Sequence, residues 1–226
     1  MKKWNELPKQ MQVEEVREYY DILEKHKLSL LGKRIFDVAV SSVMLVMISP
    51  ILIVIGAMIK ADSKGPVFFR QVRVTTYGKK FRIYKFRTMV QNAESLGTQV
   101  TTNQDARVTK MGKLLRGCRL DELPQLINIL KGEMTFVGTR PEVPKYVAAY
   151  SKEMLSTLLL PAGVTSRASI EYKDEEQLLS DAEDADEVYI HEVLPQKMEY
   201  NLNAIRNFSF FGDIKTMFAT VAAVIK

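Results

Sequence analysis

A run of 22 residues without a charged side chain, 38–59, constrains this chain more than any other feature. At about 1.5 Å per residue, a straight helix of this length just crosses a bilayer core of about 30 Å. Ser49 and Pro50 stand at its midpoint, where proline cannot donate a helical hydrogen bond and its ring pushes against the preceding turn. We therefore expect a membrane-embedded helix with a break at Ser49 and Pro50.

The charges on both sides of this run bear on its topology. Positive charge normally stays on the cytoplasmic side of a membrane, so two basic flanks predict a re-entrant hairpin that enters one leaflet and returns. An ordinary kinked transmembrane helix remains an open alternative. A soluble core helix is disfavoured because the run lacks a polar stripe, and a cleaved signal peptide because the run starts far from Met1. The flanking basic residues are Lys25, Lys27, Lys33 and Arg34 before the run, and Lys60, Lys64, Arg70 and Arg73 after it.

The net charge of +5 is unevenly distributed. Residues 171–192 carry ten acids against one lysine, which is most simply a solvated helix or loop, while the rest of the chain sums to +14. A basic body suits anionic lipid headgroups and phosphate substrates, although nucleic acid competes for any basic surface. Because Cys118 is the only cysteine, no internal disulfide forms, and a reducing cytoplasmic setting fits.

Hydrophobic spacing and turn residues predict helices around a short hairpin. Two strands, 67–72 and 81–86, are expected to join through residues 75–78. Residues 13–31 have the spacing of an amphipathic helix lying on the surface, and the apolar segment 208–225 that of an interfacial or a core helix. Further helical spacing covers residues 111–119, 124–130, 143–160 and 186–206.

The predicted hairpin is strongly basic. Residues 60–90 contain nine basic residues and one acid. Lys85 and Arg87 occupy alternate positions of a strand and therefore share one face, where a point charge and a guanidinium fork can grip one phosphate. The alternative is an edge strand carrying lysine to prevent aggregation, which we favour for Lys79 and Lys80.

Asp121 and Glu122 are adjacent carboxylates just before a helix that has Pro124 in its first turn. Free amides and the helix dipole at that position are expected to keep Asp121 ionised, as a nucleophile or a Mg²⁺ ligand requires. An isolated pair of this kind usually caps a helix. The nearby cations Arg116 and Arg140 change that reading, because acids with Mg²⁺ and arginines together suit a diphosphate.

Taken together, these segments resemble the bacterial monotopic phosphoglycosyl transferases from about Lys33 to the end of the chain. No single motif is specific, but their order and spacing are. The matching segments are Lys33-Arg34-Ile35-Phe36-Asp37, Ser49-Pro50, Gly65-Pro66-Val67-Phe68-Phe69-Arg70-Gln71, Tyr84-Lys85-Phe86-Arg87-Thr88-Met89, Leu120-Asp121-Glu122-Leu123-Pro124-Gln125-Leu126, Leu130-Lys131-Gly132-Glu133-Met134 and Val137-Gly138-Thr139-Arg140-Pro141.

The resemblance implies a Mg²⁺-dependent transfer of a sugar 1-phosphate from a UDP-sugar to a polyprenyl (undecaprenyl) phosphate, with release of UMP. This is the first membrane step of exopolysaccharide, capsule or glycoconjugate assembly in that family. It implies Asp121 as nucleophile and Glu122 as the group that assists deprotonation of the lipid phosphate or holds the metal. By the same resemblance, the phosphate-binding residues are Lys85, Arg87, Arg116 and Arg140, and Ser49-Pro50 breaks the membrane helix.

The expected architecture is α+β, a mainly helical compact domain with a short β-hairpin. Residues 1–32 form the amphipathic N-terminal helix, 33–60 the re-entrant (helix-break-helix) membrane hairpin, and 61–226 the cytoplasmic catalytic domain with C-terminal interfacial helices. The expected location is the cytoplasmic face of the bacterial inner membrane. No nucleic acid is expected as a partner, and homodimer formation stays open.

Two other functions remain open beside this one. A membrane-anchored protein that binds RNA or anionic lipid without catalysis uses the basic hairpin alone, but the basic cluster lacks aromatic residues arranged to stack bases. A scaffold with an inactive site is disfavoured because both acids and all four cations are present. The chain departs from the family pattern at two places. Cys118-Arg119 precede Leu120, where a small hydroxyl residue is common, and Thr139 stands where proline is frequent.

Overall fold

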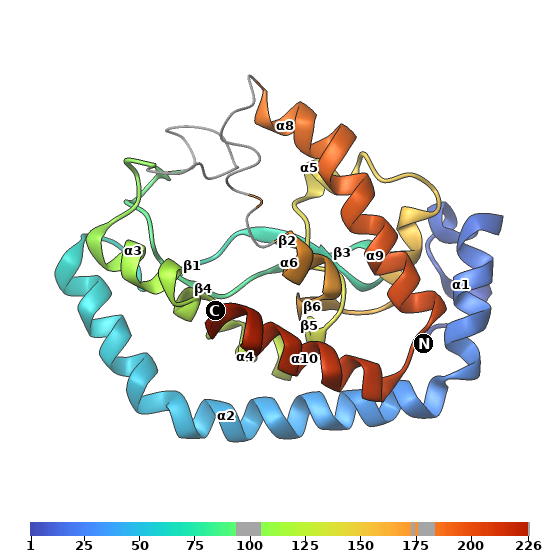
Figure 1. The fold of residues 1–226 in the computed structure, drawn as a ribbon, viewed down its shortest axis with the longest axis horizontal. Coiled ribbons are helices and arrows are strands. Elements are labelled where there is room, and N and C mark those ends of the chain that lie inside the picture. Colours follow the sequence, from blue (N-terminus) through green and yellow to red (C-terminus); the bar gives the residue numbers. More distant parts are fainter. Residues whose placement is uncertain (94–104, 173–174, 176–183, 226) are drawn as a thin grey trace.

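The computed structural model describes residues 1–93, 105–172, 175 and 184–225. Helices surround a few short strands (Figure 1), as the sequence predicts for a mainly helical domain. The strands are β1 (Phe68–Phe69), β2 (Val72–Thr75), β3 (Lys79–Arg82), β4 (Lys85–Phe86), β5 (Met134–Val137) and β6 (Ala162–Thr165). The helices are α1 (Glu14–Lys25), α2 (Lys27–Asp62), α3 (Lys110–Gly117), α4 (Gln125–Leu130), α5 (Pro144–Val147), α6 (Arg167–Glu171), α8 (Ala185–Val188), α9 (Leu194–Arg206) and α10 (Phe210–Ile225). Short 3-10 segments include Thr76–Gly78, Leu120–Glu122 and Met154–Leu159, and a π-helical segment, Tyr189–Val193, links α8 to α9.

The long apolar helix α2 contains 36 residues and includes the predicted break point. Helical structure continues through Ser49 and Pro50, so the predicted interruption into two helices is not present in this structure. The Ser49 hydroxyl donates to the carbonyl of Val46 at 2.8 Å, within the turn that precedes the proline. Figure 1 shows α2 following the lower edge of the molecule and then turning upward toward α3. Among the described residues, α2 is the helix long and apolar enough to cross a membrane.

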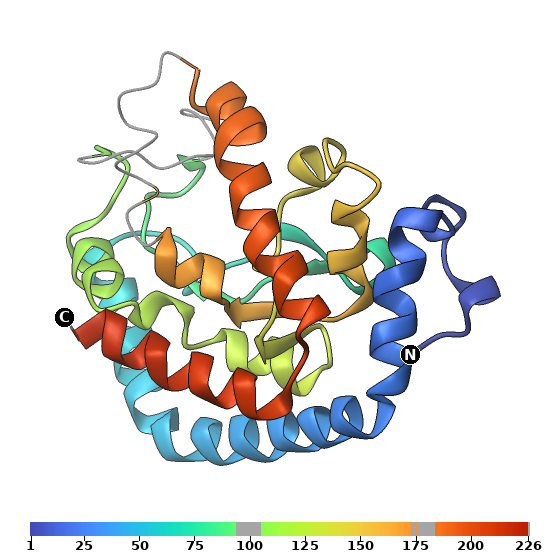
Figure 2. The same ribbon diagram turned by 45° about the vertical axis from the view of Figure 1, so that its right-hand side comes forward.

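Most of α2 faces outward. Only 11% of its most apolar 18-residue window is buried, which excludes the role of a core helix in a soluble protein. Helix α10 lies beside α2 (Figures 1 and 2) and also carries exposed apolar side chains. The chain therefore presents an apolar surface of the kind that a membrane covers. Its large exposed side chains are Leu28, Leu31, Ile35, Val38, Val43, Val46, Met47, Ile51, Ile53, Val54 and Met58 on α2, and Phe211, Phe218 and Val221 on α10.

Polar contacts fasten the first half of α2 to the domain. Lys33 donates to the carbonyl of Val137 at 2.8 Å and pairs with Asp213 of α10 at 2.5 Å. Asp37, which is 3% exposed, accepts a hydrogen bond from the Thr135 hydroxyl at 2.6 Å. Buried polar groups need such partners, so these charges fix which side of α2 faces the domain and leave the other side apolar.

The hairpin is confirmed, with its strands nearer to the turn than predicted. Strands β2 and β3 pair antiparallel from Val72 opposite Arg82 to Thr75 opposite Lys79, and β1 and β4 continue the pairing. The turn places Tyr77 and Gly78 in the left-handed region, with φ of 59° and 73°. Tight hairpin turns require this conformation, which glycine adopts without strain.

A parallel pair, β5 and β6, was not predicted. All four residues of β5 are buried. Gly138 directly follows β5 and Gly163 lies within β6, where an added Cβ would lie 2.1 Å from the Gly138 carbonyl oxygen. The close approach of these two backbones therefore requires glycine. It fixes the start of the loop that carries Arg140.

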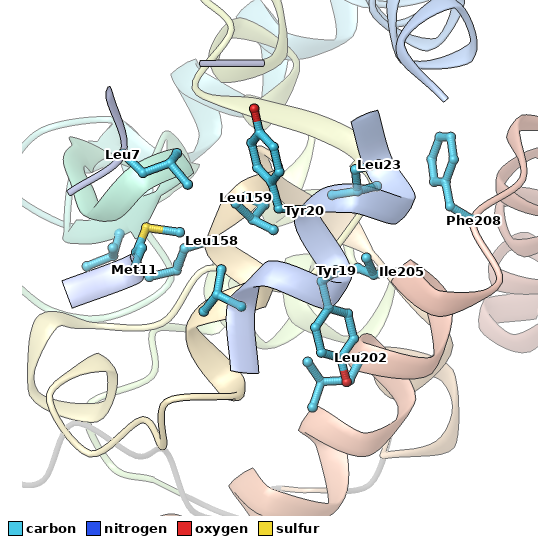
Figure 3. Close-up of a cluster of buried hydrophobic side chains, with 12 residues drawn as sticks. Leu7, Met11, Tyr19, Tyr20, Leu23, Leu158, Leu159, Leu202, Ile205 and Phe208 are labelled. Carbon is cyan, nitrogen blue, oxygen red and sulfur yellow. The ribbon is translucent and has the colours of Figure 1, made fainter. Parts of the chain in front are cut away.

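The N-terminal amphipathic segment differs from its prediction in two ways. The helix ends at Lys25, and His26 separates α1 from α2, so residues 13–31 do not form one helix. Its apolar face packs against the protein itself rather than lying open on the surface (Figure 3). The cluster joins α1 to the Met154–Leu159 turn and to α9. Its buried members are Leu7, Met11, Val16, Tyr19, Tyr20, Leu23, Val74, Leu158, Leu159, Leu202, Ile205 and Phe208.

Candidate active site

Three charged side chains from three distant segments converge on one point. Lys85 comes from β4, Glu122 from the 3-10 turn that precedes α4, and Arg140 from the loop after β5. The Lys85 ammonium donates to Glu122 Oε1 at 2.8 Å. The Arg140 guanidinium donates to both carboxylate oxygens of Glu122, at 3.3 Å from Nη1 to Oε2 and more closely from Nη2 to Oε1. Glu122 thus holds two of the cations for which the family resemblance implies phosphate binding.

Burial and charge set the protonation of this cluster. Burial raises the pKa of Glu122, but the Arg140 guanidinium and the Lys85 ammonium outweigh it and hold that pKa well below its usual range. Burial lowers the pKa of Lys85, while Glu122 opposes that change. The Glu122 carboxylate in turn raises the pKa of Arg140. Glu122 is therefore a firmly ionised acceptor and, in this arrangement, a poor base.

Asp121 differs from its neighbour. It is half-buried, and among the described residues no hydrogen bond or ion pair joins its carboxylate to another side chain. Burial raises its pKa above the ordinary value, against the opposing charges of Lys85, Arg116 and Arg140. The expectation that helix amides and the dipole keep Asp121 ionised is therefore wrong in its cause, because the residue lies within the 3-10 turn, one turn ahead of α4. Cations, not amides, favour its charged form.

The backbone on either side of the acidic pair is tightly constrained. Arg119 adopts a left-handed conformation, with φ of 55°, immediately before the 3-10 turn. A side chain in this region is unusual and is found often at functional sites. Upstream, a Cβ on Gly112 would lie 2.0 Å from the Thr88 carbonyl oxygen, so glycine lets α3 contact the end of the hairpin. Arg116 of α3 donates from Nε to the Thr88 hydroxyl at 3.0 Å, which keeps this cation near Asp121.

Arg87 does not join the other cations. It is 5% exposed, and its guanidinium donates to the carbonyls of Lys64 and Ser63, the latter at 2.7 Å, and to the Ser63 hydroxyl at 2.9 Å. These groups follow the last turn of α2, where carbonyls lack helical partners. The prediction that Lys85 and Arg87 grip one phosphate is therefore not supported: Arg87 closes the end of the long helix, and Lys85 faces the acidic pair.

A second group of buried charges, which the sequence did not reveal, lies next to this site, and we call it the inner network. Glu142 accepts a hydrogen bond from the Tyr189 hydroxyl at 2.6 Å and lies 4.0 Å from the Arg73 guanidinium. Lys197 donates to Tyr189 at 3.1 Å and to Glu175 at 2.7 Å. These residues are far apart in sequence, and charges on helices ordinarily face solvent, so no sequence signal identified them. The network supports the loop that carries Arg140.

The acidic pair suits a divalent cation only together with a substrate. Among the described residues, no group of three or more histidine, cysteine, aspartate or glutamate side chains could hold a metal alone. Mg²⁺, however, is commonly bound by one or two carboxylates plus substrate phosphates and water. Asp121 has oxygens without protein partners and lies beside Glu122, so the donor set fits Mg²⁺ on a phosphate.

Comparison with known proteins agrees with this chemistry. A family model described as bacterial sugar transferase matches residues 28–226. An Aeromonas hydrophila protein named UDP-N-acetylgalactosamine-undecaprenyl-phosphate N-acetylgalactosaminephosphotransferase is 35% identical over 85% of this chain and 43% of its own length. A Klebsiella pneumoniae protein named UDP-glucose:undecaprenyl-phosphate glucose-1-phosphate transferase is 39% identical over 86% of this chain and 40% of its own length.

A shorter relative matches nearly from end to end. The Bacillus subtilis protein named uncharacterized sugar transferase EpsL is 33% identical over 85% of this chain and 87% of its own length. The chain spans less than half the length of the two relatives described before it. The match over residues 28–226 includes α2, both acids and the cations around them. The chain belongs to the bacterial sugar transferase family.

Proposed function

We propose that this protein transfers a sugar 1-phosphate from a UDP-sugar to polyprenyl (undecaprenyl) phosphate and releases UMP, as the first membrane step of a glycan assembly such as exopolysaccharide or capsule. The observation that carries the proposal is the contrast at the acidic pair. Glu122 is fully engaged by Lys85 and Arg140, whereas the Asp121 carboxylate has no such partner among the described residues. A carboxylate kept free beside three cations suits attack on a phosphate.

The transfer takes two displacement steps. In the first, an Asp121 oxygen attacks the sugar-bearing phosphorus, a new P–O bond forms, and the bond to the bridging oxygen breaks so that UMP leaves with it. In the second, an oxygen of the lipid phosphate attacks the same phosphorus. The bond to Asp121 then breaks, which gives the lipid diphosphate sugar and restores the carboxylate. Splitting the reaction lets two phosphate substrates use one pocket in turn.

The surrounding side chains serve charge stabilisation. Lys85 and Arg140 can exchange part of their contact with Glu122 for a substrate phosphate, and Arg116 lies within electrostatic reach of Asp121. The low pKa of Glu122 favours its role as a holder of cations over that of a base for the lipid. Asp121 and Glu122 are the residues that would hold Mg²⁺, which when bound neutralises phosphate charge.

The membrane arrangement follows from the exposed apolar side chains. We place α2 in the bilayer as a re-entrant element bent at Ser49 and Pro50, with the catalytic domain and α10 at the cytoplasmic face of the inner membrane. Basic residues on both sides of the run support this topology over a spanning helix, and so does the course of α2, which follows the lower edge of the domain and then turns back toward α3 (Figure 1). It would hold the acidic pair near the depth at which a polyprenyl phosphate presents its charge.

An assay of UMP release tests the function. The membrane-reconstituted protein with Mg²⁺, undecaprenyl phosphate and a panel of UDP-sugars should release UMP with at least one donor, and the panel identifies the sugar. Asp121→Asn should abolish release, because the amide cannot attack phosphorus. Retained turnover in Asp121→Asn would remove Asp121 as nucleophile. RNA binding without UMP formation in the wild type would favour a binding protein.

Cysteine labelling tests the topology. In a Cys118→Ser background, single cysteines replace Lys25 and Lys64, which stand on opposite sides of the apolar run. A re-entrant α2 leaves both accessible to a membrane-impermeant reagent from the cytoplasmic side only. Labelling of the two positions from opposite faces would show that α2 crosses the bilayer.

A further inference from the structure

The side-chain amide of Gln125 is buried in the protein without a hydrogen-bond partner among the described residues. Its side chain is 1% exposed, and neither the amide nitrogen nor the amide oxygen has a hydrogen-bond partner within the described part of the chain. A buried amide without partners costs free energy, so native proteins rarely keep one without a role. An apolar side chain of similar shape would serve folding better.

The position of Gln125 relates it to the acidic pair. From the 3-10 turn into α4 the backbone follows a right-handed helical path, since Leu123 has φ of −52° and ψ of −37° and Pro124 has φ of −63° and ψ of −12°. Side chains three or four residues apart on such a path share a face. Gln125 stands four residues after Asp121 and three after Glu122, so all three belong to the same side.

Two hydrogen bonds bracket Gln125 along this face. Three residues before it, Glu122 accepts the hydrogen bond from Lys85. Three residues after it, the buried Asn128 accepts a hydrogen bond from the backbone N–H of Tyr84 at 2.8 Å. Because Tyr84 and Lys85 are consecutive, both contacts reach the same stretch of chain. Gln125 therefore stands between two residues of the same helical path that both bind the segment carrying Lys85.

Glu122 is the group that would need the unused N–H donor of Gln125 once substrate binds. Its present partners are the two cations Lys85 and Arg140, and a substrate phosphate competes for both. When these cations turn toward phosphate, a buried carboxylate loses hydrogen bonds that keep it ionised and in place. Gln125, three residues further along the same face, carries an N–H donor that no other described group uses.

We propose that Gln125 is a positioning residue whose amide donates to Glu122 while Lys85 and Arg140 hold the substrate phosphates. This inference rests on the proposed function. It explains why a polar side chain is kept in a place where folding alone favours an apolar one. It also assigns a task to a residue that touches neither the reacting atoms nor solvent.

Two matched substitutions test the proposal. Gln125→Met removes the amide and keeps an unbranched side chain. Ser156→Ala is the control, since the Ser156 hydroxyl is equally buried and without a partner in the described chain, but lies in the Met154–Leu159 turn, which packs against α1 and α9. Both variants should raise the thermal midpoint by about 2–4 °C, because each removes an unsatisfied buried group.

Only Gln125→Met should slow the reaction. We expect kcat for UMP release to fall roughly 10–100-fold, the range for a lost hydrogen bond to a charged group, with a much smaller change in KM. Gln125→Asn, which keeps a shorter amide, should recover part of the loss. A Gln125→Met protein with unchanged kcat, or with a lowered midpoint, would overturn the proposal. Absence of turnover in the wild type would instead contradict the proposed function itself, and this inference with it.

Discussion

The candidate active site and the inner network are both buried groups of charges, and they are close in sequence. Arg140 belongs to the first and Glu142 to the second, with Pro141 between them. In the inner network each ion has a counterpart, since Lys197 contacts Glu175 and lies 3.8 Å from Glu142. A counter-ion for each buried charge is what a structural ion network requires, although the Arg73 Nε has no hydrogen-bond partner in the described chain.

At the candidate active site the pairing is incomplete. Two cations share one carboxylate, Glu122, while the adjacent Asp121 has no partner and Gln125 has an unused amide among the described residues. Such groups reduce stability and are tolerated where chemistry uses them. The comparison teaches that buried charge alone does not mark a site in this molecule. A candidate site is marked by buried charges together with a neighbouring carboxylate and amide that lack partners.

Breaking the inner network should have the largest effect on stability. Lys197→Met leaves Glu175 and Glu142 without their ammonium partner in a buried place, and we expect a loss of about 3–5 kcal/mol in the free energy of unfolding. Turnover per folded molecule should stay near that of the wild type. Thermal unfolding and UMP release measured on the same preparation check both parts.

Lys145→Met is the matched control for that change. Lys145 also pairs with an acid, Asp186, but its side chain is 53% exposed, so its loss should cost less than about 1 kcal/mol. If Lys197→Met proved as mild as this control, the inner network would not be the structural group that the comparison makes it.

Neutralising Glu122 should lower the stability of the protein, whereas neutralising Asp121 should raise it. Glu122→Gln leaves Lys85 and Arg140 without their carboxylate, and we expect the free energy of unfolding to fall by about 1.5–3 kcal/mol. Asp121→Asn removes a carboxylate whose pKa burial raises, so it should make the protein more stable at neutral pH. Thermal midpoints at pH 7 measure both, and changes of the same sign would contradict the contrast between the two residues.

The pH dependence of these variants follows from the pKa directions. Glu122 has a depressed folded pKa, so its contribution is complete above its ordinary value of 4.5 and is lost as the pH falls through the folded value. Asp121 has a raised folded pKa, so loss of its proton favours the unfolded chain, and the advantage of Asp121→Asn grows as the pH rises above the ordinary value of 3.8 and is complete above the folded value. The stability of the two variants should therefore converge in acid. If the difference in stability between Glu122→Gln and Asp121→Asn did not narrow below pH 4.5, these pKa shifts would be contradicted.

The grouping of charges at the acidic pair could be expected from the sequence because its signals are local. Asp121 and Glu122 are adjacent, and cations near a diphosphate site are recognisable by type, so the convergence of Lys85 and Arg140 on Glu122 agrees with the prediction. The hairpin was found because residues 75–78 punctuate two apolar runs. Each of these signals lies within a short window.

The features that were missed depend on distant contacts. Strands β5 and β6 pair across residues 134–165, and four buried residues do not show a period that separates strand from helix. The apolar face of α1 has the same spacing whether a bilayer or the protein covers it, and here residues near the other end of the chain do so.

Among the buried charges, Arg87 gives the smallest expected effect, and its variant tests whether it belongs to the candidate site or to the scaffold. Arg87→Lys keeps the charge but loses the fork that reaches Ser63 and Lys64, so we expect about 1–2 kcal/mol less stability with kcat and KM unchanged. The measurement is a thermal midpoint together with KM for the donor sugar nucleotide. A raised KM at unchanged stability would return Arg87 to the phosphate-binding group, and the end of α2 would then belong to the active site.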